Sequence, residues 1–372
     1  MKEIKGAYTS AKIFTDNVED YAIAQVQLIC DNVAADGSTI RVMPDVHPGK
    51  VGPIGLTMTV TNAVLPNIVG IDIGCGMTMA KLKDKRMEFQ KLDAVIRENI
   101  PAGFAVRKKP HRYSEQFDFA RLKCFKHINL PKAMLSMGTL GGGNHFIEVD
   151  QDDDKQLYII IHSGSRSLGK AVAEYYLKVG QAELKAKGIE VPYEMTYLTG
   201  DLMADYLHDQ QIVQEYAAQN RAAMLDEIVK GMKLKAENIT SCVHNYIEIG
   251  ENYKILRKGA ISAKAGEEVI IPINMKDGVI IGTGKGNDEW NYSAPHGAGR
   301  VLKRTEVSSK YTVSSFKKEM KGIYTSCIGK DTLDEAPFAY RNLEDIKDLI
   351  SDTVEIQKIL KPVYNFKAGG ND

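Results

Sequence analysis

In this 372-residue chain, the histidines are the side chains whose positions in the sequence most clearly indicate chemistry. Five of the eight histidines lie in short, turn-like peptides beside Gly, Asn, Pro or Ser. These peptides are MPDVHPGKVGPIG (43–55), GTLGGGNHFIEV (138–149), IHSGSRSLG (161–169), VHNY (243–246) and APHGAGR (294–300), and a sixth, GIDIGCGM (70–77), places Asp72 and Cys75 between glycines. Neutral imidazole, thiolate and carboxylate are the usual protein ligands of transition metals. No compact zinc spacing is present, so a metal site would be assembled from segments distant in sequence.

Each of these peptides also has a simpler interpretation when it is taken alone. A single histidine at a strand end is often a hydrogen-bonded structural residue, and a single cysteine is often a small buried apolar one. A glycine-rich turn often means only that the backbone needs a positive φ. The recurrence of six peptides favours a metal site, but the residues alone leave both interpretations open. His111, His127 and His208 lack such contexts, and we expect them at the surface.

Glycine and arginine near the same histidines add a signal for phosphate binding. Glycines precede His145, a glycine and Arg166 follow His162, and two glycines and Arg300 follow His296. Successive backbone N–H groups in such turns can bind an anion, and arginine binds phosphate oxygens with two donors. GTGKGND (282–288) lacks the spacer of a Walker A loop, and no G-x-G-x-x-G connects a strand to a helix. A P-loop NTPase and a dinucleotide dehydrogenase therefore fit poorly.

The elements that would position these peptides alternate irregularly between helix and strand. Helical periodicity covers residues 11–35, 167–187, 201–233 and 341–360, and short apolar runs predict strands at 54–60, 68–73, 146–149, 157–161, 245–249, 253–257, 269–273 and 278–282. The order is not a regular βαβ repeat, so we expect an α+β fold with a mixed or antiparallel β core flanked by helices. No linker is evident, and residues 1–372 are expected to form a single large domain.

Composition excludes several classes of protein. The chain carries 48 basic and 48 acidic residues, which argues against a polybasic nucleic-acid coat and against an acidic tail. A local basic track for nucleic acid remains open, formed by residues 107–112 with Arg166, Arg300, Lys303 and Arg304. No signal-peptide or membrane-spanning pattern is present, and the five cysteines are odd in number and widely spaced. These features predict a cytoplasmic protein with free thiols and no membrane partner.

In combination, the peptides resemble the RtcB family of RNA ligases. MPDVH, GIDIGCGM, GGGNHFIEV, HSGSR, RKGA (257–260) and HGAGR occur in the family's order, and DEAPFAY (334–340) extends the match towards the end of the chain. HGAGR and DIGCGM together are highly specific. The resemblance implies the family's single domain, with an active site assembled from strand-end loops.

The resemblance also implies a metal centre with two divalent ions, typically manganese. Cys75 matches the cysteine that bridges the ions, Asp72 and His145 match the other ligands of one ion, and His162 and His244 match those of the second. By softness alone this ligand set would suit zinc as well.

His296 matches the nucleophile that forms a GMP–histidine intermediate from GTP. The guanylate then passes to an RNA 3′-phosphate, giving RNA-(3′)pp(5′)G, and a 5′-hydroxyl end closes the strand; a 2′,3′-cyclic phosphate is first opened.

Glu148 matches a residue that accepts hydrogen bonds from guanine, and Asp45 matches an acidic position whose role stays open. The other positions that match nucleotide contacts are Asn144, Arg166, Asn245, Pro272, Asn274, Met275, Gly297, Ala298, Gly299, Arg300 and Lys367.

Departures from the family pattern affect the nucleotide and RNA contacts more than the reaction. Pro48 follows the MPDVH histidine in place of an aromatic residue, Asn274 stands for a serine, and Arg341 stands for a lysine. They suggest a divergent bacterial branch that repairs tRNA or ribosomal RNA instead of splicing introns. The natural RNA and any accessory activating protein are not specified by the sequence.

The same residues are also compatible with two other functions. A two-metal phosphodiesterase or phosphatase acting on RNA ends would use the same Asp, Cys and His residues without a covalent histidine. A catalytically inactive protein that binds RNA ends is the second alternative, and the intact HGAGR peptide argues against it.

Overall fold

Two β-sheets form the framework, and the computed structural model describes residues 1–368. The first sheet has six strands in the order β1 (Lys2–Lys5), β2 (Ser10–Ile13), β3 (Ile40–His47), β4 (Ile54–Thr59), β12 (Lys254–Lys258) and β11 (Asn245–Ile249). The second has seven strands in the order β10 (Ala236–Val243), β6 (Gly76–Leu82), β8 (Leu157–Ser163), β7 (Phe146–Gln151), β17 (Val354–Lys367), β15 (Gly278–Gly284) and β14 (Glu268–Asn274). All pairs are antiparallel except β2 with β3. Two short pairs join β5 (Ala63–Val64) to β9 (Leu198–Thr199) and β13 (Ala260–Ser262) to β16 (Ser293–Pro295).

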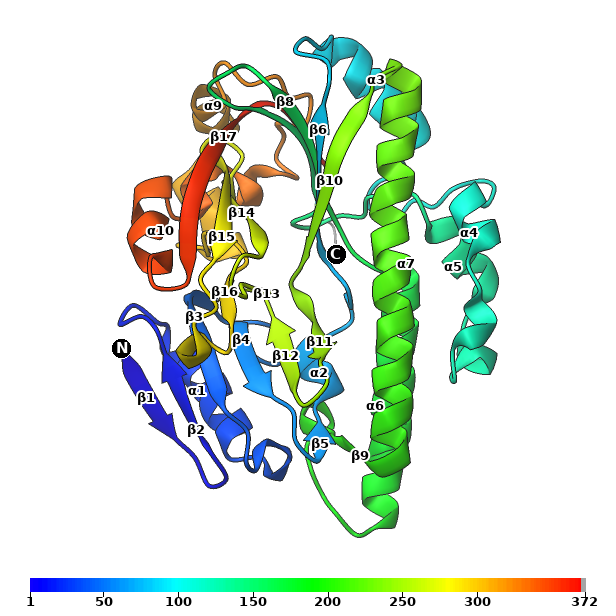
Figure 1. Cartoon of the computed structure of the whole chain (residues 1–372), viewed down its shortest axis with the longest axis vertical. Coiled ribbons are helices and arrows are strands. Elements are labelled where there is room, and N and C mark those ends of the chain that lie inside the picture. Colours follow the sequence, from blue (N-terminus) through cyan, green and yellow to red (C-terminus); the bar gives the residue numbers. More distant parts are fainter. Residues whose placement is uncertain (369–372) are drawn as a thin grey trace.

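Helices cover the sheets and connect their strands. The long helix α7 (Gly200–Met232) runs along the longest axis of the molecule beside both sheets, next to α6 (Arg166–Ala186) (Figure 1). The others are α1 (Asp20–Cys30), α2 (Pro66–Val69), α3 (Phe89–Asn99), α4 (Arg112–Gln116), α5 (Leu130–Ser136), α8 (Arg304–Lys310), α9 (Val313–Glu319) and α10 (Leu343–Ile350). The α+β class with a largely antiparallel core is therefore confirmed.

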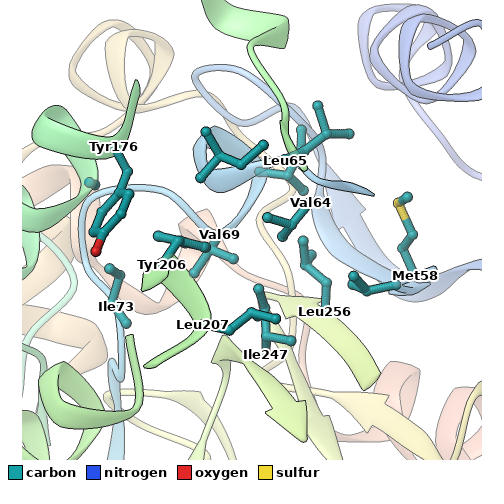
Figure 2. Close-up of a cluster of buried hydrophobic side chains, with 14 of the residues drawn as sticks. Met58, Val64, Leu65, Val69, Ile73, Tyr176, Tyr206, Leu207, Ile247 and Leu256 are labelled. Atoms are coloured by element: carbon teal, nitrogen blue, oxygen red, sulfur yellow. The ribbon is translucent and has the colours of Figure 1, made fainter. Parts of the chain in front are cut away.

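The largest buried cluster packs α6 and α7 against the first sheet. Figure 2 shows Tyr176 from α6 and Tyr206 from α7 among apolar side chains from β4, β11 and β12. Ile73 belongs to the same cluster and is fully buried. Because Ile73 lies between Asp72 and Cys75, its burial anchors the loop that carries both of these residues to the core.

Several element predictions are confirmed and three are wrong. The helices expected at 167–187 and 201–233 are α6 and α7. The helix expected at 11–35 is limited to α1, because Ser10–Ile13 pairs with β1 and Val33 lies in a separate turn with 43% exposure. Residues 68–73 are not a strand: Pro66 begins the short helix α2, and Gly70 ends it at φ 85°. The helix expected at 341–360 ends at Ile350, since the β-branched residues from Val354 onward pair with β15.

Candidate active site

The five predicted metal ligands meet at one end of neighbouring strands in the second sheet. Cys75 directly precedes β6, His162 lies near the end of β8, and His145 directly precedes β7. Antiparallel pairing aligns Met77 and Phe146 with His162, which brings the three segments together. His244 occupies the junction between β10 and β11, where the chain passes from the second sheet to the first.

The ligand atoms form two groups that share one sulfur. The Sγ of Cys75 lies 3.4 Å from the Nε2 atoms of both His145 and His162. His145 Nε2 is 3.0 Å from Asp72 Oδ2, and His162 Nε2 is 3.3 Å from His244 Nε2. In each of the groups Asp72–Cys75–His145 and Cys75–His162–His244 the ligand atoms all lie within 4.8 Å of one another. This spacing fits two ions bridged by one thiolate.

Backbone carbonyls fix the tautomers of two of these histidines in the form that a metal requires. The Nδ1 of His145 is 2.9 Å from the Leu140 carbonyl oxygen, and the Nδ1 of His162 is 3.1 Å from that of Asn144. An N–H at Nδ1 that donates to a carbonyl leaves the Nε2 lone pair free to bind an ion. In both residues Nε2 is the nitrogen that faces Cys75, so the donor chemistry fits a metal.

Burial sets the charge of the cluster. It lowers the pKa values of His162 and His244 well below the usual range, so both rings are neutral ligands. Burial raises the pKa of the Cys75 thiol well above its usual range, and the Asp72 carboxylate raises it further. Burial acts on Asp72 in the same direction, but a hydrogen bond donated by His145 Nε2 in the metal-free protein holds its pKa below the usual range. A bound ion would take the place of that Nε2 proton. A cation bound here would therefore displace the thiol proton.

His296 lies beside this cluster and is oriented by a buried carboxylate. Its Nδ1 is 2.8 Å from Oδ2 of Asp45, a fully buried residue of β3. The ring of His296 lies 4.9 Å from that of His244, measured between centroids. With the Nδ1 proton held by Asp45, Nε2 keeps its lone pair and can act as a nucleophile. The sequence left the role of Asp45 open, and this contact indicates that Asp45 orients the ring of His296.

A cavity beside His296 collects most of the predicted nucleotide contacts. It is lined by Asn144, Glu148, Pro272, Asn274, Met275, Gly297, Ala298, Gly299, Arg300 and Lys367, together with His162, His244 and His296. Glu148 is 3% exposed, and the Asn365 side chain donates a 2.6 Å hydrogen bond to its Oε2. The cavity therefore combines polar groups such as Glu148 and Lys367 with apolar surface from Pro272 and Met275.

Two predicted nucleotide contacts lie outside the lining of this cavity. Arg166 begins α6 and donates from Nη2 to the Gly103 carbonyl at 3.2 Å. Asn245 accepts from the Gly259 N–H at 3.0 Å and donates to the Asp72 carbonyl at 3.4 Å. In this arrangement Asn245 braces the loop of Asp72.

Glu335 is a well-connected cavity residue that we did not predict. Its Oε2 lies 2.8 Å from Lys367 Nζ and accepts a 2.6 Å hydrogen bond from the Tyr340 hydroxyl, and its Oε1 lies 2.5 Å from Arg304 Nη1. Burial raises the pKa of Glu335, but the charges of Lys367, Arg304 and Arg300 outweigh it and lower the pKa to about 2. The ionised carboxylate therefore holds Lys367 at the cavity wall. Glu335 lies in the DEAPFAY peptide, and this match to the family was the sequence feature that could have identified it.

The expected surface position is wrong for His111. His111 is buried, with Nε2 3.2 Å from Glu227, and it caps α4. Arg107 and Arg112 pair with Glu227 and Asp226 of α7 at 2.8 Å each, so their charges are compensated within the fold.

The fold and the site together define an α+β protein in which a cluster of candidate metal ligands borders a cavity of mixed polarity, beside a histidine oriented by a carboxylate. The family model described as "RtcB: tRNA-splicing ligase RtcB" matches residues 30–368. The chain is 32% identical to the RNA-splicing ligase RtcB of Escherichia coli K12, over 96% of this chain and 97% of that protein. It is 25% identical to the tRNA-splicing ligase RtcB of Methanococcus maripaludis, over 86% of this chain and 85% of that protein. The chain belongs to the RtcB family, a family of RNA ligases.

Membrane insertion finds no support in the helices. Within residues 1–368, none combines the length and the apolar character that crossing a bilayer requires.

Proposed function

We propose that this chain is a GTP- and Mn²⁺-dependent RNA ligase that joins 3′-phosphate or 2′,3′-cyclic phosphate ends to 5′-hydroxyl ends. The observation that carries the proposal is the contact between the buried Asp45 carboxylate and His296, beside two ligand groups that share Cys75. Membership of the RtcB family supports an RNA substrate, and we propose tRNA or ribosomal RNA. We further propose that residues 1–372 act as one domain in the cytoplasm, where its five free cysteines stay reduced.

His296 would act first, on GTP. Its Nε2 lone pair attacks the α-phosphorus, a P–N bond forms, the bond to the bridging oxygen breaks, and pyrophosphate leaves. The Asp45 carboxylate keeps the proton on Nδ1 and stabilises the positive charge that develops on the ring. Divalent ions held by the Asp72, Cys75, His145, His162 and His244 cluster would offset the negative charge on the phosphate oxygens.

The guanylate then serves to activate the RNA end. An oxygen of the 3′-phosphate attacks the guanylate phosphorus, and His296 leaves with its lone pair restored. The RNA-(3′)pp(5′)G so formed carries a good leaving group. The 5′-hydroxyl oxygen attacks the RNA phosphorus, its proton is lost, and GMP departs. A 2′,3′-cyclic end first adds water to give the 3′-phosphate.

Glu148 would select guanine over adenine. The hydrogen bond from Asn365 fixes one carboxylate oxygen, and the side chain borders the cavity. Guanine presents N1–H and N2–H donors on one edge, whereas adenine has no matching pair of donors. A buried carboxylate left without these donors costs about 1–3 kcal/mol or more, which disfavours ATP.

The ligation of RNA with defined ends tests the proposal. With GTP and Mn²⁺, we expect an RNA ending in a 2′,3′-cyclic phosphate to be joined to a 5′-hydroxyl RNA but not to a 5′-phosphate RNA. Removal of the terminal phosphate without any joined product would instead identify a phosphatase, which has no need of the Asp45–His296 pair. Joining that prefers the 5′-phosphate end would refute the proposed polarity.

The loop at residues 101–110 is our proposed contact for the RNA backbone. The Gly103 N–H donates to the Gly141 carbonyl at 2.9 Å, so the loop lies against the glycine turn that leads to His145. Lys108 and Lys109 are exposed on it. Because Arg107 is paired with Glu227, these two lysines supply the charge that phosphates would meet.

Charge reversal in this loop should weaken RNA binding and leave the first chemical step intact. For the Lys108→Glu/Lys109→Glu variant we expect KM for RNA to rise roughly tenfold at low salt, with guanylation of His296 unchanged. The matched control is Lys85→Glu/Arg86→Glu, which makes the same charge change beyond the opposite end of β6. An equal rise in KM for both variants would show only a general effect of net charge.

A further inference from the structure

Two neighbouring residues of α7 form hydrogen bonds with the three loops that carry Cys75, His145 and His162. Asn220 and Arg221 are both fully buried within the helix. Neither is among the metal ligands or the cavity-lining residues. Their side chains end on backbone atoms next to Cys75, His162 and the glycine turn before His145.

Asn220 joins the glycine turn to the end of β8. Its Oδ1 accepts hydrogen bonds from the N–H groups of Gly138 and Thr139 at 2.8 and 3.1 Å. Its Nδ2 donates to the Ser163 hydroxyl at 3.1 Å and to the Gly164 carbonyl at 3.0 Å. Both the oxygen and the NH₂ group of the amide are therefore hydrogen-bonded, and together they fix one loop relative to the other.

The same connection reaches the histidines through one carbonyl. The Leu140 carbonyl oxygen follows the segment held by Asn220. It lies 2.9 Å from His145 Nδ1 and accepts a 2.8 Å hydrogen bond from the Ser163 hydroxyl. A displacement of this turn would therefore break the hydrogen bond at Nδ1 that orients the His145 ring and fixes its tautomer.

Arg221 joins the end of β8 to the loop of Cys75. Its Nη1 donates to the Gly74 carbonyl and to the Ser163 carbonyl, at 2.9 Å each. These residues directly precede Cys75 and directly follow His162. Its Nε donates to Thr78 Oγ1 at 3.0 Å, and Nη2 is buried without a hydrogen-bond partner in the described part of the chain.

The packing of the Cys75 loop on α7 leaves no room for adjustment. Gly74 has φ 76°, and a Cβ there would come within 2.9 Å of the Gln214 backbone and 3.0 Å of the Ala217 side chain. The loop thus rests directly on the helix that carries Arg221. A rigid helix with a two-residue clamp sets the separation of the three loops.

We propose that Asn220 and Arg221 are positioning residues of the metal centre, which hold the loops of Cys75, His145 and His162 at the separation that two bridged ions require. Arg221 also places a buried positive charge near Cys75, where a metal-bound thiolate would carry negative charge. The proposal rests on the metal centre of the proposed function.

Titration of the metal-free, full-length protein with Co²⁺ alone tests the clamp. In the unaltered protein we expect a thiolate-to-cobalt charge-transfer band, which is absent in Cys75→Ser. Asn220→Ala and Arg221→Met should bind Co²⁺ about 10- to 100-fold more weakly and with an altered band. Arg221→Lys, which keeps the charge and one donor, should fall between Arg221→Met and the unaltered protein.

Asp209→Asn is the matched control on the same helix. The buried Asp209 carboxylate accepts from the N–H groups of Lys123 and Cys124 and from the Tyr176 hydroxyl, away from the ligand loops. Asp209→Asn should lower Tm and leave Co²⁺ affinity unchanged. Wild-type affinity and band shape in the clamp variants, or an equal loss of affinity in Asp209→Asn, would overturn the clamp alone. The absence of any thiolate–cobalt band in the unaltered protein would overturn the metal centre and the clamp together.

Discussion

Replacing Asp45 with Asn should reduce the guanylation of His296 by about 10²- to 10⁴-fold while the protein still binds metal. An amide that donates its N–H to Nδ1 forces the ring proton onto Nε2, and the lone pair that attacks GTP is lost. Asp45→Ala should have a similar effect, since nothing then fixes the tautomer or the orientation of the ring. Both variants are measured by the rate of label transfer from α-labelled GTP to the protein.

The control for Asp45 is the metal content of the same preparations. Asp45 contacts His296 and none of the five predicted ligands. Both variants should therefore contain as much manganese per chain as the unaltered protein. A variant that loses manganese as well would have disturbed the loops, and its rate would say nothing about the tautomer. Near-normal guanylation in both variants, with manganese retained, would contradict the role assigned to Asp45.

Replacing Cys75 with Ser should remove bound metal and lower ligation by more than about 10³-fold. Cys75 is the one residue that belongs to both ligand groups, so its loss affects both ions. A serine hydroxyl has nearly the same shape, but it does not ionise near neutral pH and is a poor ligand for a bridging position. The readout is the manganese content per chain after dialysis, followed by the ligation rate.

Cys242→Ser provides a matched change at a second buried cysteine. Cys242 lies in β10, where it pairs with Met77, and belongs to neither ligand group. It should retain manganese and ligation, with at most a moderate loss of stability from burying a hydroxyl. Unchanged manganese in Cys75→Ser would argue directly against a bridging thiolate.

Histidines in short turn-like peptides with Gly, Asn, Pro or Ser could be predicted from the sequence. His145, His162, His244 and His296 each lie in such a peptide, and the antiparallel pairing of β6, β8 and β7 brings the first two together. The positions of α6 and α7 followed from helical periodicity alone. Local pattern was sufficient wherever a residue's neighbours in sequence also decide its conformation.

Contacts between distant segments could not be predicted in the same way. Asp45 and His296 are 251 residues apart, and the packing of β16, which directly precedes His296, against β3 brings them together. Asn220 and Arg221 lie inside a regular helix, where nothing local distinguishes a buried clamp from a solvated polar pair. Val354 fitted a helical stripe equally well, and pairing with β15 decided for a strand.

The covalent step on His296 is the central claim, and α-labelled GTP tests it most directly. The protein is incubated with the nucleotide and Mn²⁺ and then separated under denaturing conditions. We expect label on the unaltered chain that is released by acid, as a phosphoramidate would be, and none on His296→Ala. Absence of label on the unaltered protein would contradict the proposed ligase reaction, whereas label that persists in His296→Ala would show that another residue is the nucleophile.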